Sequence, residues 1–126
     1  MGIDIYARWE GMTEQEETAQ LKVWASAEDG DVGYLREAYH GEPYATRVLV
    51  EEAFRHSSGR VPIAAQLLQD RLPQVLKLAE QRERDVYNVT DPAEIERVLK
   101  SFRDFVALCA RKEAETGKPC RIYASW

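Results

Sequence analysis

Ile3-Asp4-Ile5-Tyr6-Ala7-Arg8-Trp9 and Cys120-Arg121-Ile122-Tyr123-Ala124-Ser125-Trp126, close to the two ends of the chain, share the pattern Ile-Tyr-Ala-x-Trp. Apolar and polar residues alternate in both stretches with a period of two, which is typical of a β-strand with one covered face. Ile, Ala and Trp fall on one side, and Tyr with the charged residues falls on the other. We therefore predict that the two terminal segments pair within one sheet.

The clearest predicted helix spans residues 91–116. Asp91 is a typical N-cap, Pro92 suits the first helical position, and Glu94 can complete a capping box. Gly117 then favours a left-handed stop. Seven apolar residues at helical spacing form one face, which we expect to pack on the sheet: Ile95, Val98, Leu99, Phe102, Phe105, Val106 and Cys109.

Two further helical segments are expected in the middle of the chain. Residues 62–87 carry a broad apolar face, but Pro73 interrupts the pattern, so either a kink or two helices meeting there is expected. Residues 43–54 form a shorter predicted helix, followed by a polar connector at 56–60. The apolar face of the longer segment comprises Ile63, Leu67, Leu68, Leu72, Val75, Leu76 and Ala79.

The pattern between the first strand and residue 43 is weaker. Residues 21–27 and 32–39 flank the turn-rich stretch 28–31, which indicates a β-hairpin. The second arm also fits one helical turn, so strand and helix both stay open for it. Residues 11–20, rich in Glu and Thr, are expected to form a loop or a short exposed helix.

These patterns predict an α+β fold, with a small, mostly antiparallel sheet that contains both terminal strands and packs against three or four helices. A length of 126 residues with 44% hydrophobic content suits one domain, so residues 1–126 are expected to form a single domain. No apolar run approaches the roughly 20 residues that span a bilayer, and no basic and then apolar signal segment follows Met1. We expect a cytoplasmic protein with no membrane association.

The charge of the chain bears on its partners. A net charge of -5 argues against a general nucleic-acid binder, because such proteins need clustered Lys and Arg to neutralise phosphates. The sequence contains no Cys-x-x-Cys and no pair of histidines at ligand spacing, so no metal is expected. Glycine signatures of nucleotide binding are missing too, so no cofactor is expected.

Cys109 and Cys120 are interpreted as reduced, structural thiols. The helix that carries Cys109 is expected to continue to Thr116, about 10 Å further along its axis at 1.5 Å per residue. The returning strand begins only at Cys120, which places the two residues beyond the roughly 7 Å limit between the Cα atoms of a disulfide.

The segment 33–47 supports the main functional hypothesis. Gly41 and Pro43 place His40 just before an expected helix start, where free amides and the positive end of the helix favour an anion. Arginines there can hold a carboxylate or phosphate, and tyrosines supply flat walls with polar tips. We predict a non-enzymatic binding or interaction protein with a pocket for a small anionic ligand or an acidic peptide, lined by Tyr34, Arg36, Tyr39, His40, Tyr44 and Arg47.

Two alternatives apply to this segment. In the first, the segment binds no ligand: its tyrosines lie at strand edges and its arginines face solvent. The chain can also be a small enzyme in which His40 acts as general acid or base with Tyr and Arg support. No Gly-x-Ser-x-Gly motif or other nucleophile motif accompanies the histidine, which favours a protein that is not an enzyme.

The polar side of the terminal strands is a second candidate surface. Sheets with such a face can stack the bases of single-stranded RNA or form a symmetric homodimer interface rich in Tyr and Arg. The acidic charge of the chain favours the homodimer. A third alternative is that a helix, such as segment 62–87, covers this face. The residues expected on it are Asp4, Tyr6, Arg8, Arg121, Tyr123 and Ser125.

Overall fold

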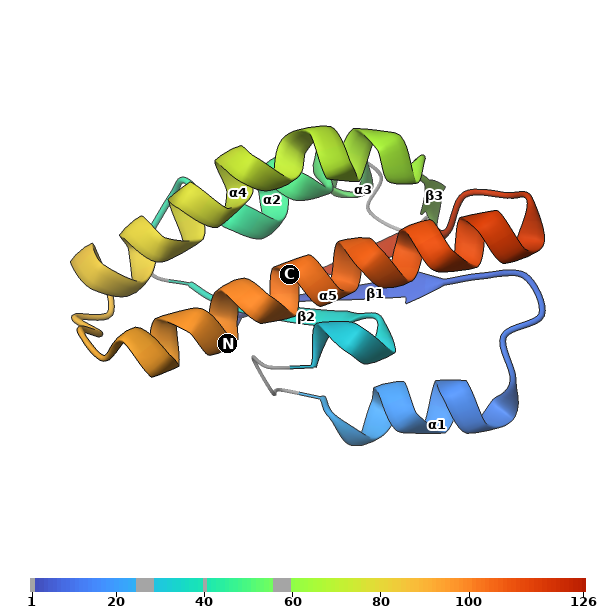
Figure 1. Ribbon diagram of the computed structural model, residues 1–126, viewed down its shortest axis with the longest axis horizontal. Helices are drawn as coiled ribbons and strands as arrows, with labels where there is room; N and C mark the ends of the chain where they lie inside the picture. Colours follow the sequence, from blue (N-terminus) through green and yellow to red (C-terminus); the bar gives the residue numbers. More distant parts are fainter. Residues whose placement is uncertain (1, 25–28, 40, 56–59) are drawn as a thin grey trace.

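The computed structural model describes residues 2–24, 29–39, 41–55 and 60–126. It confirms the predicted α+β fold, with five α-helices in these residues where three or four were expected (Figure 1). None of the helices in these ranges is long and apolar enough to cross a bilayer. In chain order the elements are β1 (Gly2–Arg8), α1 (Glu14–Lys22), the 3₁₀ helix η1 (Gly30–Val32), β2 (Tyr34–Ala38), α2 (Ala45–Leu49), α3 (Glu51–Phe54), β3 (Val61–Pro62), α4 (Ala65–Asp85), α5 (Pro92–Thr116) and β4 (Arg121–Ser125).

The four strands form one antiparallel sheet in the order β2-β1-β4-β3. The terminal strands β1 and β4 are neighbours, as predicted, and Tyr6 lies opposite Tyr123 in their register. Ile5, Ala7 and Ile122 are fully buried on one face. Because side chains alternate along a strand, the two tyrosines lie on the opposite face, which we call the open face.

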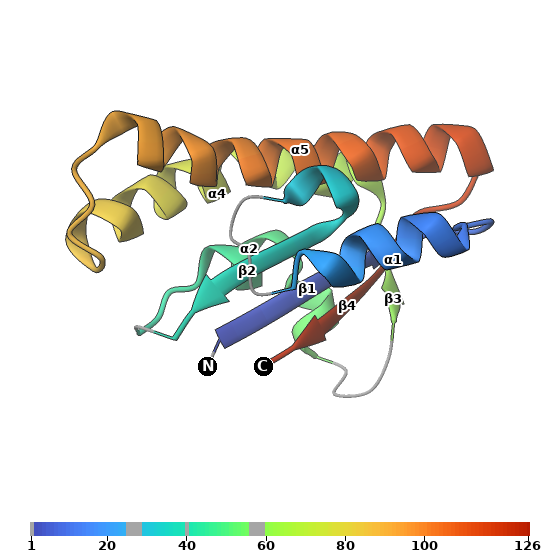
Figure 2. The ribbon, with the colours of Figure 1, turned by 90° about the horizontal axis from the view of Figure 1, so that it is seen from below.

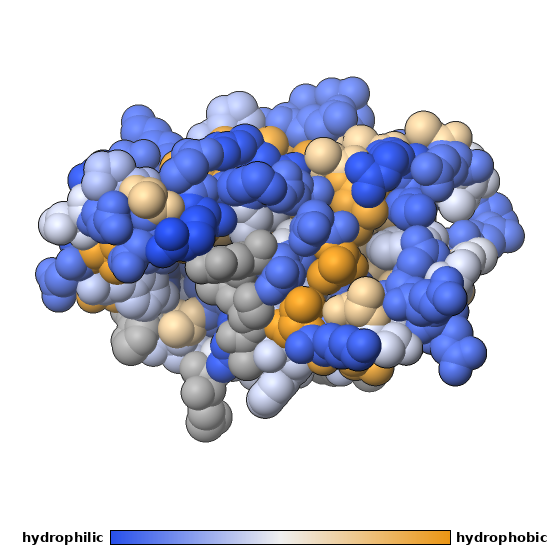
Figure 3. All heavy atoms as spheres, turned by 60° about the horizontal axis from the view of Figure 1, so that its bottom comes forward, coloured by the Kyte–Doolittle hydropathy of each residue, from blue (hydrophilic) through white to orange (hydrophobic). Residues whose placement is uncertain are grey.

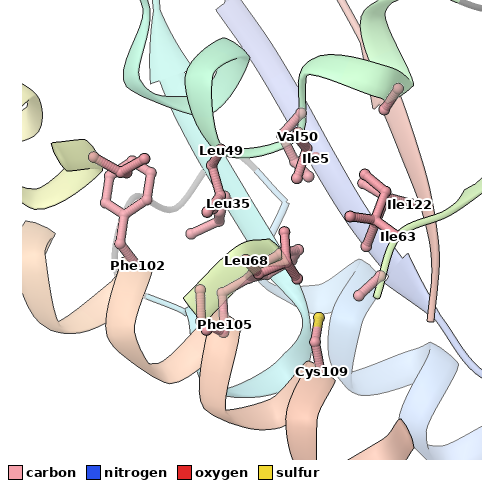
Figure 4. Packing of buried hydrophobic residues seen from close by; sticks show 14 of the residues in the cluster. Ile5, Leu35, Leu49, Val50, Ile63, Leu68, Phe102, Phe105, Cys109 and Ile122 are labelled. Carbon is pink, nitrogen blue, oxygen red and sulfur yellow. The ribbon is translucent and has the colours of Figure 1, made fainter. Parts of the chain in front are cut away.

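The buried face of the sheet packs against α4 and α5. Asp91 caps α5 by accepting a hydrogen bond from the amide of Ala93 at 3.0 Å, and Gly117 ends it in the left-handed conformation, so both predicted boundaries are confirmed. Figure 4 shows Phe105 of α5 and Leu68 of α4 directed toward the sheet. Residues 95–109 therefore present the predicted apolar face to the core.

The α4 helix differs from the expectation in two respects. It runs continuously through Pro73, so the alternative of two separate helices is wrong. Pro73 and Gln69 are both exposed, and water can therefore satisfy the carbonyl that the proline leaves without its helical donor. The helix also packs beside α5 on the buried face, so the idea that segment 62–87 covers the open face is wrong.

The predicted hairpin is wrong in the described part of its first arm, because Leu21 and Lys22 end a helix, while residues 25–27 lie outside the described residues. Of the two alternatives for residues 11–20, the short helix is confirmed: α1 opens with a capping box between Thr13 and Glu16. The buried amide of Gln20 ties this helix to the sheet by donating to the carbonyls of Ala7 and Gly33, at 3.0 Å each. The second arm is resolved as strand β2. Figures 1 and 2 show α1 on the opposite side of the sheet from α4.

The segment predicted as one helix over residues 43–54 is split. Val50 separates α2 from α3 with φ -122° and ψ 46°, which no α-helix accommodates. Val50 is also fully buried, together with Leu49 and Ala53. The break therefore lets residues on both short helices reach the core. Most of the connector predicted at 56–60 lies outside the described residues.

Candidate functional site

The structure separates the residues predicted to line one anion pocket. Tyr34 and Arg36 of β2 lie on the open face, because they are in register with Tyr6 and Asp4 of β1. Tyr39 and Tyr44 pack against the hydrophobic core, with their ring centroids 6.2 Å apart. His40 lies outside the described residues.

Asp4 engages both predicted residues on the open face. Its carboxylate accepts a hydrogen bond from the Tyr34 hydroxyl and forms an ion pair with Arg36 at 2.8 Å. The Arg36 guanidinium also lies 5.9 Å from the centre of the Trp24 ring. Arg36 is therefore already neutralised within the protein.

Arg47 lies away from both groups. It forms an exposed ion pair with Glu42 at 3.2 Å, and its guanidinium lies 5.6 Å from the Phe54 ring centre. Exposed pairs of this kind contribute only about 0 to 1 kcal/mol to stability. Arg47 does not meet Arg36 around a common ligand position.

The helix start that was expected to attract an anion already holds one from the protein itself. The carboxylate of Glu37 accepts hydrogen bonds from the amides of Ala45 and Thr46 at 2.9 and 3.0 Å, and from the Thr46 hydroxyl at 2.6 Å. These groups are buried. The amides that were assumed to be free in the sequence argument are therefore occupied.

Arg82 of α4 completes this network. Its side chain is 4% exposed, and its Nε lies 3.0 Å from the Glu37 carboxylate. It donates to the carbonyls of Gly41 and Pro43 at 2.6 and 2.8 Å and lies 4.9 Å from the Tyr44 ring centre. The network holds residues 37–39 and 41–46 in place, and its geometry is that of a structural anchor. Ligand binding and acid-base chemistry around His40 stay predictions.

The open face carries a different arrangement, built directly by strand register. Tyr34, Tyr6 and Tyr123 stand opposite one another on β2, β1 and β4, and we call them the tyrosine row. Ring centroids are 5.2 Å apart for the first pair and 6.0 Å for the second. Burial, and then the Asp4 carboxylate, raise the pKa of Tyr6, so its hydroxyl stays protonated at neutral pH.

Three arginines gather next to the tyrosine row, and we call Arg8, Arg60 and Arg121 the arginine cluster. Arg8 and Arg121 stand directly opposite each other in the β1–β4 register. Val61 pairs with Ile122, so alternation places Arg60 on the open face beside Tyr123. Arg8 pairs with Glu17 of α1 at 2.8 Å, whereas Arg60 and Arg121 form no ion pair with any described residue.

The surface over these residues is hollowed. One hollow of about 610 Å³ is lined by Tyr6, Arg8, Leu21, Arg60, Arg121 and Tyr123. A neighbouring hollow of about 310 Å³ is lined by Arg8, Trp9, Glu10, Arg60, Lys118, Pro119 and Arg121. All three residues of the arginine cluster line both hollows.

Large side chains are exposed on this side of the sheet. Leu21 of α1, which lines the larger hollow with the arginine cluster, is 59% exposed, and Tyr123 is 36% exposed. Trp24 is 61% exposed and lies against Arg36, nearer the other end of β1. Figure 3 views the side of the molecule that carries α1 and shows a band of apolar residues between hydrophilic ones. The open face thus combines aromatic, apolar and cationic groups at one accessible surface. The six residues that the strand pattern predicted for this face do lie on it by register: Asp4, Tyr6, Arg8, Arg121, Tyr123 and Ser125. The pattern missed Arg60, Leu21 and Trp24.

A further cavity of about 270 Å³ lies between β2 and the helices α4 and α5. Its charged lining includes Glu37 and Arg82, which neutralise each other. Burial raises the pKa of Glu83, which also lines it. Val98 and Phe102 also line the cavity. Its two cationic side chains are already paired within the protein, Arg82 with Glu37 and Arg36 with Asp4. This cavity is a weaker candidate than the open face.

The two cysteines are free and buried, but their side chains interact, whereas the sequence argument expected them to lie too far apart to form a disulfide. The Cys120 thiol lies 3.8 Å from the Cys109 carbonyl oxygen, so β4 returns closely along α5. Interaction with the Cys120 thiol, and then burial, raise the pKa of Cys109. Interaction with Cys109 lowers the pKa of Cys120 in turn. Neither side chain reaches the open face. Among the described residues no cluster of His, Cys, Asp or Glu has the composition of a metal site.

Comparison with models of known families, with curated proteins and with solved structures finds no match to this chain.

Proposed function

We propose that this chain is a non-enzymatic interaction protein that binds a protein partner through the open face of its sheet. The observation that carries the proposal is that Tyr6 and Tyr123 of the tyrosine row line a hollow together with the arginine cluster, with Leu21 exposed beside them. Tyr34 is fully buried and supports the row from below the surface. Tyr, Trp and Arg are the residues that protein interfaces concentrate in their centres. The same three residue types, with a single lysine in the adjoining hollow, make up most of this surface.

The geometry favours this face over the segment 33–47. Glu37 forms an ion pair with Arg82 and accepts the amide hydrogen bonds at the start of α2, whereas Arg60 and Arg121 lack a described carboxylate partner. A group that is already neutralised has little to gain from a ligand. Groups that are still charged, next to exposed aromatic rings, gain both charge-assisted hydrogen bonds and buried area.

The proposal includes the cytoplasmic location expected from the sequence. The buried thiols Cys109 and Cys120 support it, because paired cysteines in secreted proteins are usually oxidised.

A peptide-display selection tests the proposal. A random peptide library is selected on the wild-type protein, and each recovered peptide is measured against the Tyr123→Ala and Leu67→Ala variants. Leu67 is 43% exposed on α4, across the sheet from Tyr123, and serves as the matched control. We expect recovered peptides to lose at least about tenfold in affinity with Tyr123→Ala, as for an interface anchor, and to keep it with Leu67→Ala. Peptides that depend on neither change, or only on Leu67, would refute the proposal.

A further inference from the structure

We propose that the partner is an acidic segment of another protein, which places Asp or Glu carboxylates on the arginine cluster and an apolar side chain against Tyr6 and Tyr123. The inference rests on the proposed function and specifies the chemistry of the partner at the same face.

Local charge is the first argument. The open face and its margin carry five cations, Arg8, Arg36, Arg60, Arg121 and Lys118, against three carboxylates, Asp4, Glu17 and Glu10. Glu10 pairs with Lys118 at 2.9 Å. Asp4 neutralises Arg36 and Glu17 neutralises Arg8. The chain as a whole has a net charge of -5, so this surface is opposite in sign to the remainder of the protein. A surface of this kind attracts and orients an acidic partner.

Strand register supplies the second argument. Arg8 and Arg121 face each other across β1 and β4, an arrangement of like charges that destabilises a sheet. Only Arg8 has a carboxylate from the described part of the chain. A carboxylate from a partner at Arg121 and Arg60 would relieve this repulsion. Arginine is suited to the role, because its planar guanidinium can donate two parallel hydrogen bonds to one carboxylate.

Position relative to the aromatic groups gives the third argument. Tyr6 and Tyr123 line the same 610 Å³ hollow as the three arginines, and Leu21 forms its apolar wall. A partner that fills it therefore meets a cationic side and an apolar side at once. An Asp or Glu next to a Leu, Phe or Tyr matches both, whereas a free inorganic anion matches only the first.

Other occupants fit less well. A symmetric dimer through this face would bring two net-positive surfaces together. Single-stranded RNA could stack on the tyrosines, but its continuous phosphates would have to approach a protein with a net charge of -5. An acidic peptide, in contrast to RNA, brings only a few negative charges, and all of them can lie at the arginine cluster.

Fluorescence anisotropy with defined peptides tests the inference. The probe is a labelled 12-residue peptide with the repeat Glu-Leu-Glu-Tyr, and its matched control carries Gln in place of every Glu. The proteins are the wild type, Arg60→Ala, Arg121→Ala, the double arginine variant, Tyr123→Ala and Lys77→Ala. The last removes an exposed cation from α4 on the other side of the sheet. Thermal unfolding of each variant verifies that it is folded.

The Glu peptide is expected to bind at least about tenfold more tightly than the Gln peptide, and to lose about tenfold with either arginine variant and more with both. Lys77→Ala should change nothing, and added salt should weaken the Glu peptide alone. Equal binding of the two peptides, or equal binding to wild type and the double variant, would overturn the inference. Failure of the Glu peptide to bind would do so too.

Two more outcomes would overturn it in favour of another occupant. One is tighter binding of single-stranded poly(U) than of the Glu peptide, with loss in the double variant. The other is a dimer, detected by sedimentation, that Arg121→Ala dissociates. A third outcome would reject only the acidic partner and keep the proposed function. In it, Tyr123→Ala abolishes binding of both the Gln and the Glu peptide, whereas the arginine variants bind both peptides as the wild type does.

Discussion

Replacing Arg82 by Met removes the buried cation that links Glu37 to the segment 41–44. In the wild type this side chain is 4% exposed, pairs with Glu37 and donates to the carbonyls of Gly41 and Pro43. Methionine keeps much of the apolar stem but leaves the Glu37 carboxylate buried without its cation. Removing one partner of a buried ion pair costs about 3 to 5 kcal/mol, a large part of the roughly 5 to 15 kcal/mol of a typical domain.

Urea unfolding followed by tryptophan fluorescence measures this loss. With slopes of about 1 to 3 kcal/mol per molar urea, a loss of that size lowers the midpoint by about 1 M or more. Arg84→Met is the matched control, because Arg84 lies on the same helix in an exposed pair with Glu80 and should lose no more than about 1 kcal/mol.

A double-mutant cycle with Glu37→Gln separates the pair from its other contacts. The double variant should lose less than the sum of the two single variants, because neither then leaves a lone buried charge. If Arg82→Met does not fold, Arg82→Lys, which keeps the charge, should fold with intermediate stability. The reasoning is refuted if Arg82→Met costs no more than Arg84→Met.

Two further predictions concern stability. Glu52 binds Arg71 through both oxygens, at 2.7 and 2.8 Å, and this hydrogen bonding lowers the pKa of Glu52 below its unfolded value. The stability that this pair contributes is therefore complete above the unfolded pKa of about 4.3 and is lost as the pH falls through the lower folded pKa. Glu52→Gln should lower the free energy of unfolding by about 1 kcal/mol at pH 7 and by less at pH 3. A loss that does not depend on pH would contradict this prediction. Gly30→Ala would place a Cβ 1.8 Å from the Ser101 carbonyl oxygen of α5. Calorimetry should show that the free energy of unfolding falls by about 1 to 3 kcal/mol or more. An unchanged melting temperature would contradict this prediction.

The parts of the fold that the sequence predicts are those with local signals. The alternation around Ile5 and Ile122 suffices for the paired terminal strands, since one covered face imposes a period of two. Asp91 and Gly117 mark both ends of α5 through capping alone. By contrast, α1 buries only Gln20 and therefore has no apolar stripe. The pattern of residues 11–20 therefore fits a loop as well as a short exposed helix, and the Thr-x-x-Glu capping box that begins at Thr13 is the signal that favours the helix.

The candidate site depends on contacts that no local pattern encodes. Glu37 and Arg82 are far apart in the sequence, and nothing near Ala45 shows that a carboxylate already occupies its amide. The tyrosine and arginine residues of β1 and β4 were predictable once the two strands were paired. Arg60 joins them only through β3, a two-residue strand too short to leave a pattern.

Amide chemical-shift mapping of the ¹⁵N-labelled protein with the Glu-Leu-Glu-Tyr peptide tests the central claim most directly. The account predicts that the largest shifts fall in residues 4–8, 60–62 and 121–125, and that the Arg60→Ala, Arg121→Ala double variant loses them. Shifts concentrated in residues 41–54, or on the exposed side of α4, would contradict the assignment of the open face as the binding surface.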